Sequence, residues 1–149
     1  MNRMNRKLEY ALMALKHMAS KVPGERTSAK EVVDETGCPF DATARVLQTL
    51  VHKGLLQSEQ GAHGGYLLVR DLSKVTLYEL IEAILGPLGV VRCLHGEESC
   101  ELIDRCNIVG PIGILNRKLV EFYRSLSVAE LLKVKESPHL AELVREVQV

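Results

Sequence analysis

The sequence predicts a mainly α-helical protein with one small β-hairpin. Apolar residues recur at helical spacing in several segments, and the longest of these runs from about residue 111 to residue 133. A glycine-rich stretch, GAHGG, separates two runs that favour β-strands. A chain of 149 residues is long enough for one good core, or for a small domain with an oligomerisation arm.

The first predicted helix spans roughly Arg6 to Ser20 and ends before Pro23 and Gly24, which break helices. Its apolar side chains recur every three or four residues, at Leu8, Leu12, Leu15 and Met18. The segment lacks the uninterrupted apolar core and cleavage site of a signal peptide. No apolar run in the chain approaches the length of a membrane span. We therefore expect a cytoplasmic protein without a membrane partner.

Two short helices joined by a tight link, TGCP, are predicted next. Thr27 or Ser28 can cap the first of them, and Gly37 ends it. Pro39 suits the first position of the second helix, with Cys38 as a possible cap. The pair forms a helix-turn-helix pattern. Since the hairpin follows directly, the order of elements predicts a winged helix-turn-helix, in which Gly64 and Gly65 supply the backbone conformations of the wing turn.

The second half of the chain carries a different set of elements. A helix is predicted from Thr76 to Leu85, followed by a polar loop at about 90–108 and the long helix at about 111–133. One more short helix is predicted after Pro138. The organisation is thus a winged helix-turn-helix DNA-binding domain at 1–75, and a unit at 76–149 that holds the loop, the long helix and a C-terminal tail.

The long helix is amphipathic, and a small domain offers too little surface to cover its apolar face. The sequence therefore predicts a homodimer, with the two long helices packed against each other. The expected seam contains Leu115, Leu119 and Phe122.

Charge is distributed unevenly, although the net charge is zero. Residues 1–70 hold ten Lys and Arg against seven Asp and Glu, and residues 71–149 hold nine against twelve. The excess of positive charge suits an N-terminal part that faces double-stranded DNA. The residues expected at that surface are Arg6, Lys7, Lys30 and Arg3 at phosphates, Thr43, Arg45, Gln48 and Thr49 on the recognition helix, and His63 on the wing. We expect Tyr66 to pack under the wing.

Three of the four cysteines, Cys93, Cys100 and Cys106, lie in the polar loop. In a reducing compartment, clustered thiols indicate metal or redox chemistry more often than structural disulfides. Thiolates are the ligands of iron–sulfur clusters, whereas zinc usually takes more closely spaced cysteine pairs. A 2Fe–2S or 4Fe–4S cluster is the favoured interpretation, and a zinc site or an unligated loop is the alternative.

Several segments together resemble the Rrf family of bacterial transcription regulators, which includes the iron–sulfur regulators IscR and NsrR. The resemblance covers about residues 5–132. It is carried by LEYALMAL, TSAKEVVDETG, LVHKGLLQSEQGAHGGYLL, VTLYELIEAI and the three loop cysteines. It implies a homodimeric DNA-binding regulator, expected to be a repressor and not an enzyme, whose operator affinity depends on an iron–sulfur cluster that senses nitric oxide or redox state.

The resemblance also implies where the fourth ligand lies. IscR-like proteins use a histidine shortly after the third cysteine, but Val109 takes that place here. NsrR-like proteins use an acidic residue in the first helix of the partner subunit, and Glu9 matches that position. Other candidates are His95, Glu97, Glu98 and Glu101. The alternatives to a cluster sensor are a regulator of the same fold whose thiols sense oxidants directly, and an electron-transfer iron–sulfur protein.

Two features depart from the family pattern. The gap of six residues between Cys93 and Cys100 is slightly longer than usual. Gln60 stands before the wing glycine, where the family often has an arginine that contacts the minor groove. His63 is the nearest substitute for that contact.

Overall fold

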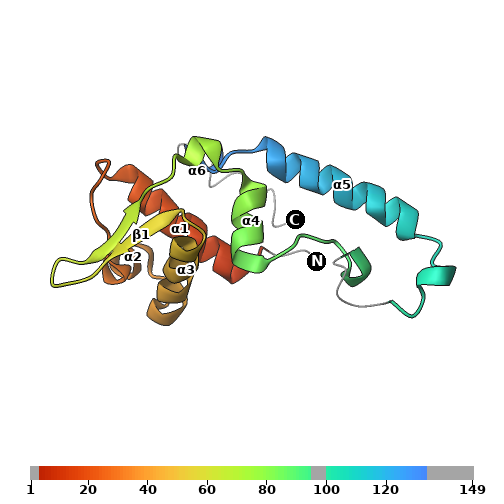
Figure 1. The fold of residues 1–149 in the computed structure, drawn as a ribbon, viewed down its shortest axis with the longest axis horizontal. Coiled ribbons are helices and arrows are strands. Elements are labelled where there is room, and N and C mark those ends of the chain that lie inside the picture. Colours follow the sequence, from red (N-terminus) through yellow and green to blue (C-terminus); the bar gives the residue numbers. More distant parts are fainter. Residues whose placement is uncertain (1–3, 95–99, 134–149) are drawn as a thin grey trace, which may run out of the picture.

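The computed structural model describes residues 4–94 and 100–133. The chain folds into a helical body with the hairpin at one end and the cysteine loop at the other (Figure 1). Arg3, His95, Glu97, Glu98 and the short helix expected after Pro138 lie outside the described residues.

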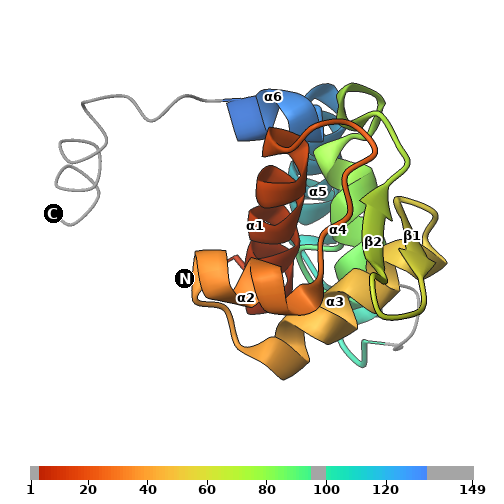
Figure 2. The same cartoon turned by 90° about the vertical axis from the view of Figure 1, so that its left-hand side faces the viewer.

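The predicted helix-turn-helix and hairpin are both present. The elements of the body are α1 (Arg6–Ser20), α2 (Ala29–Thr36), α3 (Phe40–His52), β1 (Leu56–Glu59), β2 (Gly65–Leu68) and α4 (Leu77–Leu85). Figure 2 looks along the long axis and shows α2 and α3 packed across α1, with the hairpin at the edge beside α3. The fully buried side chains at the centre include Leu15, Leu47, Leu50 and Leu80. The mainly helical fold with a β-hairpin wing is confirmed.

Local sequence signals account for most helix ends. The Ser28 hydroxyl accepts a hydrogen bond from the Glu31 backbone N–H at 3.0 Å, so Ser28 rather than Thr27 caps α2. Gly37 ends α2 with a φ of +71°, a left-handed conformation that favours glycine. The expected cap of α3 was wrong, because Pro39 holds the cap position and makes no side-chain bond. Cys38 is instead buried, with its Sγ 3.6 Å from Met13 Sδ.

A polar network fixes α2 against α1. Lys21 Nζ lies 2.6 Å from Glu31 Oε1, and His17 Nε2 lies 2.9 Å from the same oxygen. The Lys21 hydrogen bond lowers the pKa of Glu31 below its usual range, against an opposing effect of desolvation, and the His17 bond lowers it further. Glu31 therefore stays ionised at neutral pH and ties the first helix of the helix-turn-helix to the end of α1.

The wing is a regular antiparallel hairpin in which Ser58 pairs with Tyr66. Its turn differs from the expectation, because Gly61 alone in the turn has a positive φ, of +111°. Gly64 and Gly65 are required for close approach instead. A Cβ at Gly64 would lie 2.5 Å from the Glu59 carbonyl oxygen, and one at Gly65 would lie 3.0 Å from the Thr27 carbonyl oxygen.

The long helix expected at 111–133 is divided into two, which corrects the prediction. α5 (Val109–Ser125) ends at an extended Leu126, and α6 (Val128–Lys133) follows. The cause is local: Ser127 and Glu130 bond each other's backbone N–H groups, as in a capping box that starts a new helix. The break also lets Leu126–Val128 pair with Val75–Leu77, through two backbone hydrogen bonds of 2.8 Å each.

Candidate DNA-binding surface and cysteine pocket

The outer face of α3 presents polar side chains, as the helix-turn-helix pattern predicts. Arg45 and Gln48 are exposed on it. Thr49 is half-buried, and its hydroxyl donates to the Arg45 carbonyl oxygen at 2.9 Å. The expected exposure of Thr43 was wrong, because that residue is only 1% exposed. It lies three residues before Val46 and four before Leu47, which places it on the core side of the helix.

The Gln48 amide is held by the wing. Its Nε2 donates a hydrogen bond to the Tyr66 phenol oxygen at 2.9 Å. The Tyr66 backbone in turn pairs with Thr27, with N–O distances of 2.9 and 3.0 Å in the two directions. Tyr66 of β2 therefore connects the wing both to the recognition helix and to Thr27, which lies just before the cap of α2.

The remaining candidates for DNA contact are all exposed. His63 lies near the wing tip, where its carbonyl oxygen accepts a bond from Arg26 Nη1 at 3.5 Å. Arg26 also forms an ion pair with Glu59 of β1. Lys30 is exposed on the first turn of α2. Arg6 begins α1, and its Nη1 lies 3.8 Å from Glu9 Oε2.

Phe40 is a surface residue that the sequence analysis missed. It is the first residue of α3, and 53% of it is exposed. A large apolar side chain at the solvent-facing start of a recognition helix can contact a thymine methyl group. Its exposure could have been predicted from its position directly after Pro39. At the first residue of a helix, no preceding helical turn covers the side chain.

The three loop cysteines line one cavity of about 220 Å³. Cys93 lies in a short 3₁₀ turn (Arg92–Leu94), and Cys106 directly follows another (Ile103–Arg105). All three thiols are free and half-buried. The other described residues of the lining are apolar: Val91, Leu94, Ile108, Val109 and Ile112. The fold thus brings together the three residues that sequence spacing alone could only place in one loop.

The donor set of this cavity can be compared with what a zinc ion and an iron–sulfur cluster each require. Within residues 4–94 and 100–133, no three His, Cys, Asp or Glu side chains converge closely enough to hold one metal ion. Zinc requires such convergence on one point, whereas an iron–sulfur cluster spreads its thiolates over more than one iron. Three cysteines around an apolar cavity are a donor set that an iron–sulfur cluster could use, and they are equally compatible with three free thiols.

Neither candidate for the fourth ligand on the described residues lines this cavity. Glu9 lies on α1, half-buried beside Arg6, and Glu101 is exposed in the turn after Cys100. Val109, in the place where a histidine was considered, begins α5 and contributes an apolar wall. Among the described residues of one chain, the cavity is therefore lined by three thiols and not by Glu9.

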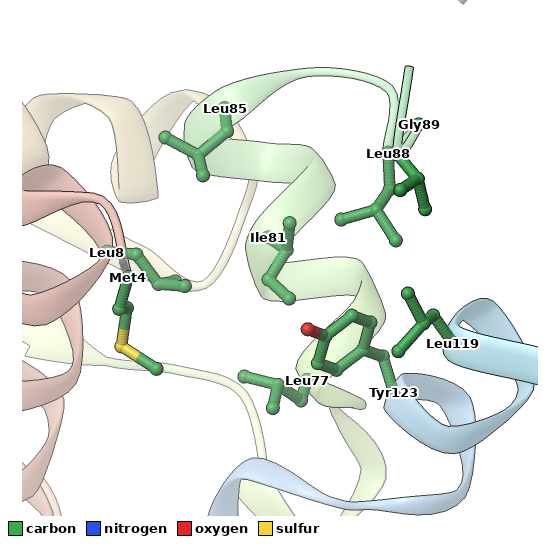
Figure 3. Close-up of a pocket in the computed structure, with 10 residues that line it drawn as sticks. Met4, Leu8, Leu77, Ile81, Leu85, Leu88, Gly89, Leu119 and Tyr123 are labelled. Atoms are coloured by element: carbon green, nitrogen blue, oxygen red, sulfur yellow. The ribbon is translucent and has the colours of Figure 1, made fainter. Parts of the chain in front are cut away.

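The outward face of α5 has no partner within the described part of the chain. Ile108, Leu115 and Phe122 recur every seven residues and are 55%, 44% and 58% exposed. Leu119, which we expected in the same seam, points instead toward α4. Together with Tyr123 it lines a hollow of about 460 Å³ that Leu8 of α1 and Met4, which precedes α1, bound on the far side (Figure 3).

The fold, with a helix-turn-helix, a wing and a polar recognition helix, defines a regulator of the winged helix-turn-helix class. A family model described as "Iron-dependent Transcriptional regulator" (Rrf2) matches residues 4–134. The chain belongs to this Rrf2 family. Because the family and its relatives are transcription regulators and not enzymes, the expectation of a non-enzymatic protein is confirmed.

Individual relatives are similar over most of their length. The HTH-type transcriptional regulator IscR of Xenorhabdus nematophila is 28% identical over 140 residues, which cover 94% of this chain and 85% of the relative. Among solved structures, CymR of B. subtilis, the global cysteine regulator, has a TM-score of 0.69 at 24% identity and covers 91% of this chain and 100% of its own. IscR of T. potens has a TM-score of 0.63 at 20% identity, covering 91% and 89%. These structural similarities support the fold.

In the part of the chain that the structure describes, no helix is long and apolar enough to cross a membrane.

Proposed function

We propose that the protein is a homodimeric repressor whose affinity for double-stranded operator DNA is controlled by an iron–sulfur cluster. The observation that carries the proposal is that Cys93, Cys100 and Cys106 line one and the same apolar cavity. The cluster, of the 2Fe–2S or 4Fe–4S type, would supply reactivity toward nitric oxide or redox change. The three thiolates would hold it from one chain, and Glu9 of the partner subunit would complete its ligands.

Glu9 is a reasonable fourth ligand because of its chemistry and its position. A carboxylate oxygen is a harder ligand than a thiolate, so the iron that it holds would be the most easily lost. The residue lies one turn into α1, directly after Leu8, which lines the apolar hollow between α1, α4 and α5. A second chain seated on that hollow and on the exposed stripe of α5 would bring its cysteine loop toward Glu9.

The described contacts give a route from the cysteine pocket to the DNA-binding surface. The first residues of α5 line the pocket, and its last residue precedes the segment that pairs with Val75–Leu77. The segment Val75–Leu77 follows the wing and leads into α4, which packs on α1 and α3. A change in what the pocket binds would therefore shift α5. Because α4 contacts α5 as well as α1 and α3, it would transmit that shift to the helix-turn-helix.

A thiol sensor without a cluster is the second candidate. It is favoured by the free state of all four thiols and by the absence, among the described residues, of a compact three-ligand group. In that case oxidation of the loop thiols would replace cluster loss as the signal. Anaerobically purified protein distinguishes the two, because a cluster gives visible absorbance whereas a thiol sensor is colourless. An electron-transfer role has no use for the recognition helix and wing.

Salt dependence tests DNA binding itself. Arg45 is exposed and has no ion-pair partner within the described residues, so its guanidinium is free for a phosphate or a base. We expect affinity for a DNA duplex, selected from a random pool, to fall with salt at a log–log slope of about −0.9 per phosphate contacted. Arg45→Ala should reduce that slope by about 0.9 if it contacts phosphate, or lower the affinity by about 5- to 150-fold if it contacts a base.

The matched control removes the same charge elsewhere. Arg117 is exposed on α5, away from the helix-turn-helix, so Arg117→Ala should change neither slope nor affinity. Titration of labelled duplex at several salt concentrations measures both quantities. Binding that does not depend on salt, or an equal loss in the two variants, would remove α3 as the DNA-reading helix.

A further inference from the structure

The hydrogen bond between Gln48 and Tyr66 joins a side chain on the exposed face of the recognition helix to the wing. Gln48 is exposed on α3, and its Nε2 lies 2.9 Å from the Tyr66 phenol oxygen. A glutamine side chain on a helix surface normally samples several rotamers, and ordering it costs conformational entropy. The phenol removes much of that freedom before DNA is bound.

Tyr66 is itself fixed by bonds that do not involve its hydroxyl. Its backbone N–H and C=O both pair with Thr27, and its ring is half-buried. Gly65 allows this pairing, since a Cβ there would press on the Thr27 carbonyl at 3.0 Å. Loss of the phenol oxygen alone would therefore leave the wing on the helix-turn-helix, and would release only the Gln48 amide.

The amide that this bond leaves available has a defined chemistry. An NH₂ group has two hydrogens, and one of them is used on Tyr66. The second hydrogen and the carbonyl oxygen remain, and the oxygen has no partner among residues 4–94 and 100–133. A neighbouring acceptor and donor on one planar group match the N6 amino group and N7 of adenine in the major groove.

We propose that Tyr66 is a positioning residue for sequence recognition, which holds the Gln48 amide so that it reads an adenine. The inference rests on the proposed function, because it requires that α3 enters the major groove. It assigns the Gly64-Gly65-Tyr66 segment a role beyond the shape of the wing: the two glycines bring Tyr66 onto the helix-turn-helix, and its hydroxyl sets the orientation of one base-reading side chain.

The test is selection of bound sequences from a randomised double-stranded DNA pool by the full chain, purified anaerobically. Wild-type protein should select an adenine at one position of each half-site, and Gln48→Ala should lose that preference. Tyr66→Phe should weaken the same preference by about 2- to 12-fold, which corresponds to the 0.5–1.5 kcal/mol cost of immobilising one side chain. The other selected positions should not change. Tyr78→Phe is the matched control, because its hydroxyl bonds Glu82 on α4.

A double-mutant cycle separates positioning from a structural role. Tyr66→Phe should have no further effect on base preference in the Gln48→Ala background, since it acts through that amide. An equal loss of affinity for all sequences, an undiminished adenine preference in Tyr66→Phe, or an effect that persists without Gln48 would each overturn the inference. Wild-type protein that selects no sequence would instead contradict the proposed DNA-binding function.

Discussion

Cys93→Ser, Cys100→Ser and Cys106→Ser are each expected to abolish or severely weaken cluster binding. The three thiols line one cavity, so each substitution removes one of the three ligands that we propose come from the same chain. A serine hydroxyl is a harder and much less acidic group than a thiol, and it replaces a thiolate poorly on iron. Visible absorbance and iron content of anaerobically purified protein measure the loss.

Cys38→Ser is the matched control for this series. Cys38 is buried against Met13 between α1 and the start of α3, and it does not line the cysteine cavity. Its substitution should leave the absorbance unchanged and cost only a modest amount of stability. If Cys38→Ser alone bleached the protein, or if one of the loop variants kept a full complement of iron, the assignment of the ligands would be wrong.

Phe122→Glu is expected to convert the proposed homodimer into a monomer. Phe122 is 58% exposed in the single chain and lies on the stripe that also contains Ile108 and Leu115. A carboxylate buried without a partner in an apolar interface costs several kcal/mol, enough to shift association by orders of magnitude. Because the side chain is exposed in the single chain, the fold of each subunit should be preserved. Light scattering measures the mass, and circular dichroism measures the helix content.

Arg117→Glu provides the comparison, since it adds a carboxylate to α5 away from the apolar stripe. It should remain dimeric. Leu119→Glu is a poor probe of the interface, because Leu119 lines the hollow between α4 and α5 and its substitution would disturb the subunit itself. A Phe122→Glu protein that keeps the mass of a dimer would place the interface elsewhere.

Local sequence patterns predicted the elements whose boundaries depend on short-range chemistry. The apolar repeat predicted α1, Ser28 and Gly37 define α2, and the hairpin follows from its glycine-rich tip. The break at Leu126 was predictable in principle, because Ser127 and Glu130 have the spacing of a capping box. The apolar pattern continues through that break, so periodicity alone predicted one continuous helix in place of α5 and α6.

The candidate site was predicted less completely, since it depends on contacts between distant segments. Thr43 could have been placed on the core face, because it shares the spacing of Val46, Leu47 and Leu50. The Gln48–Tyr66 bond could not, because it requires the position of the wing over α3. The meeting of three cysteines in one apolar cavity likewise depends on the path of a loop, which periodicity does not encode. The role of Glu9 depends on a second subunit, and it stays a prediction.

The account is tested most directly by the affinity of cluster-loaded and cluster-free protein for the same selected DNA duplex. We predict that the two forms of the wild-type protein differ by about 5- to 150-fold, the range of a coupling free energy of 1–3 kcal/mol. In Glu9→Ala, which should keep some cluster through its three thiolates, that difference should shrink toward unity. Equal affinities of the two wild-type forms would contradict control of DNA binding by a cluster, and an undiminished difference in Glu9→Ala would contradict Glu9 as the ligand from the partner subunit.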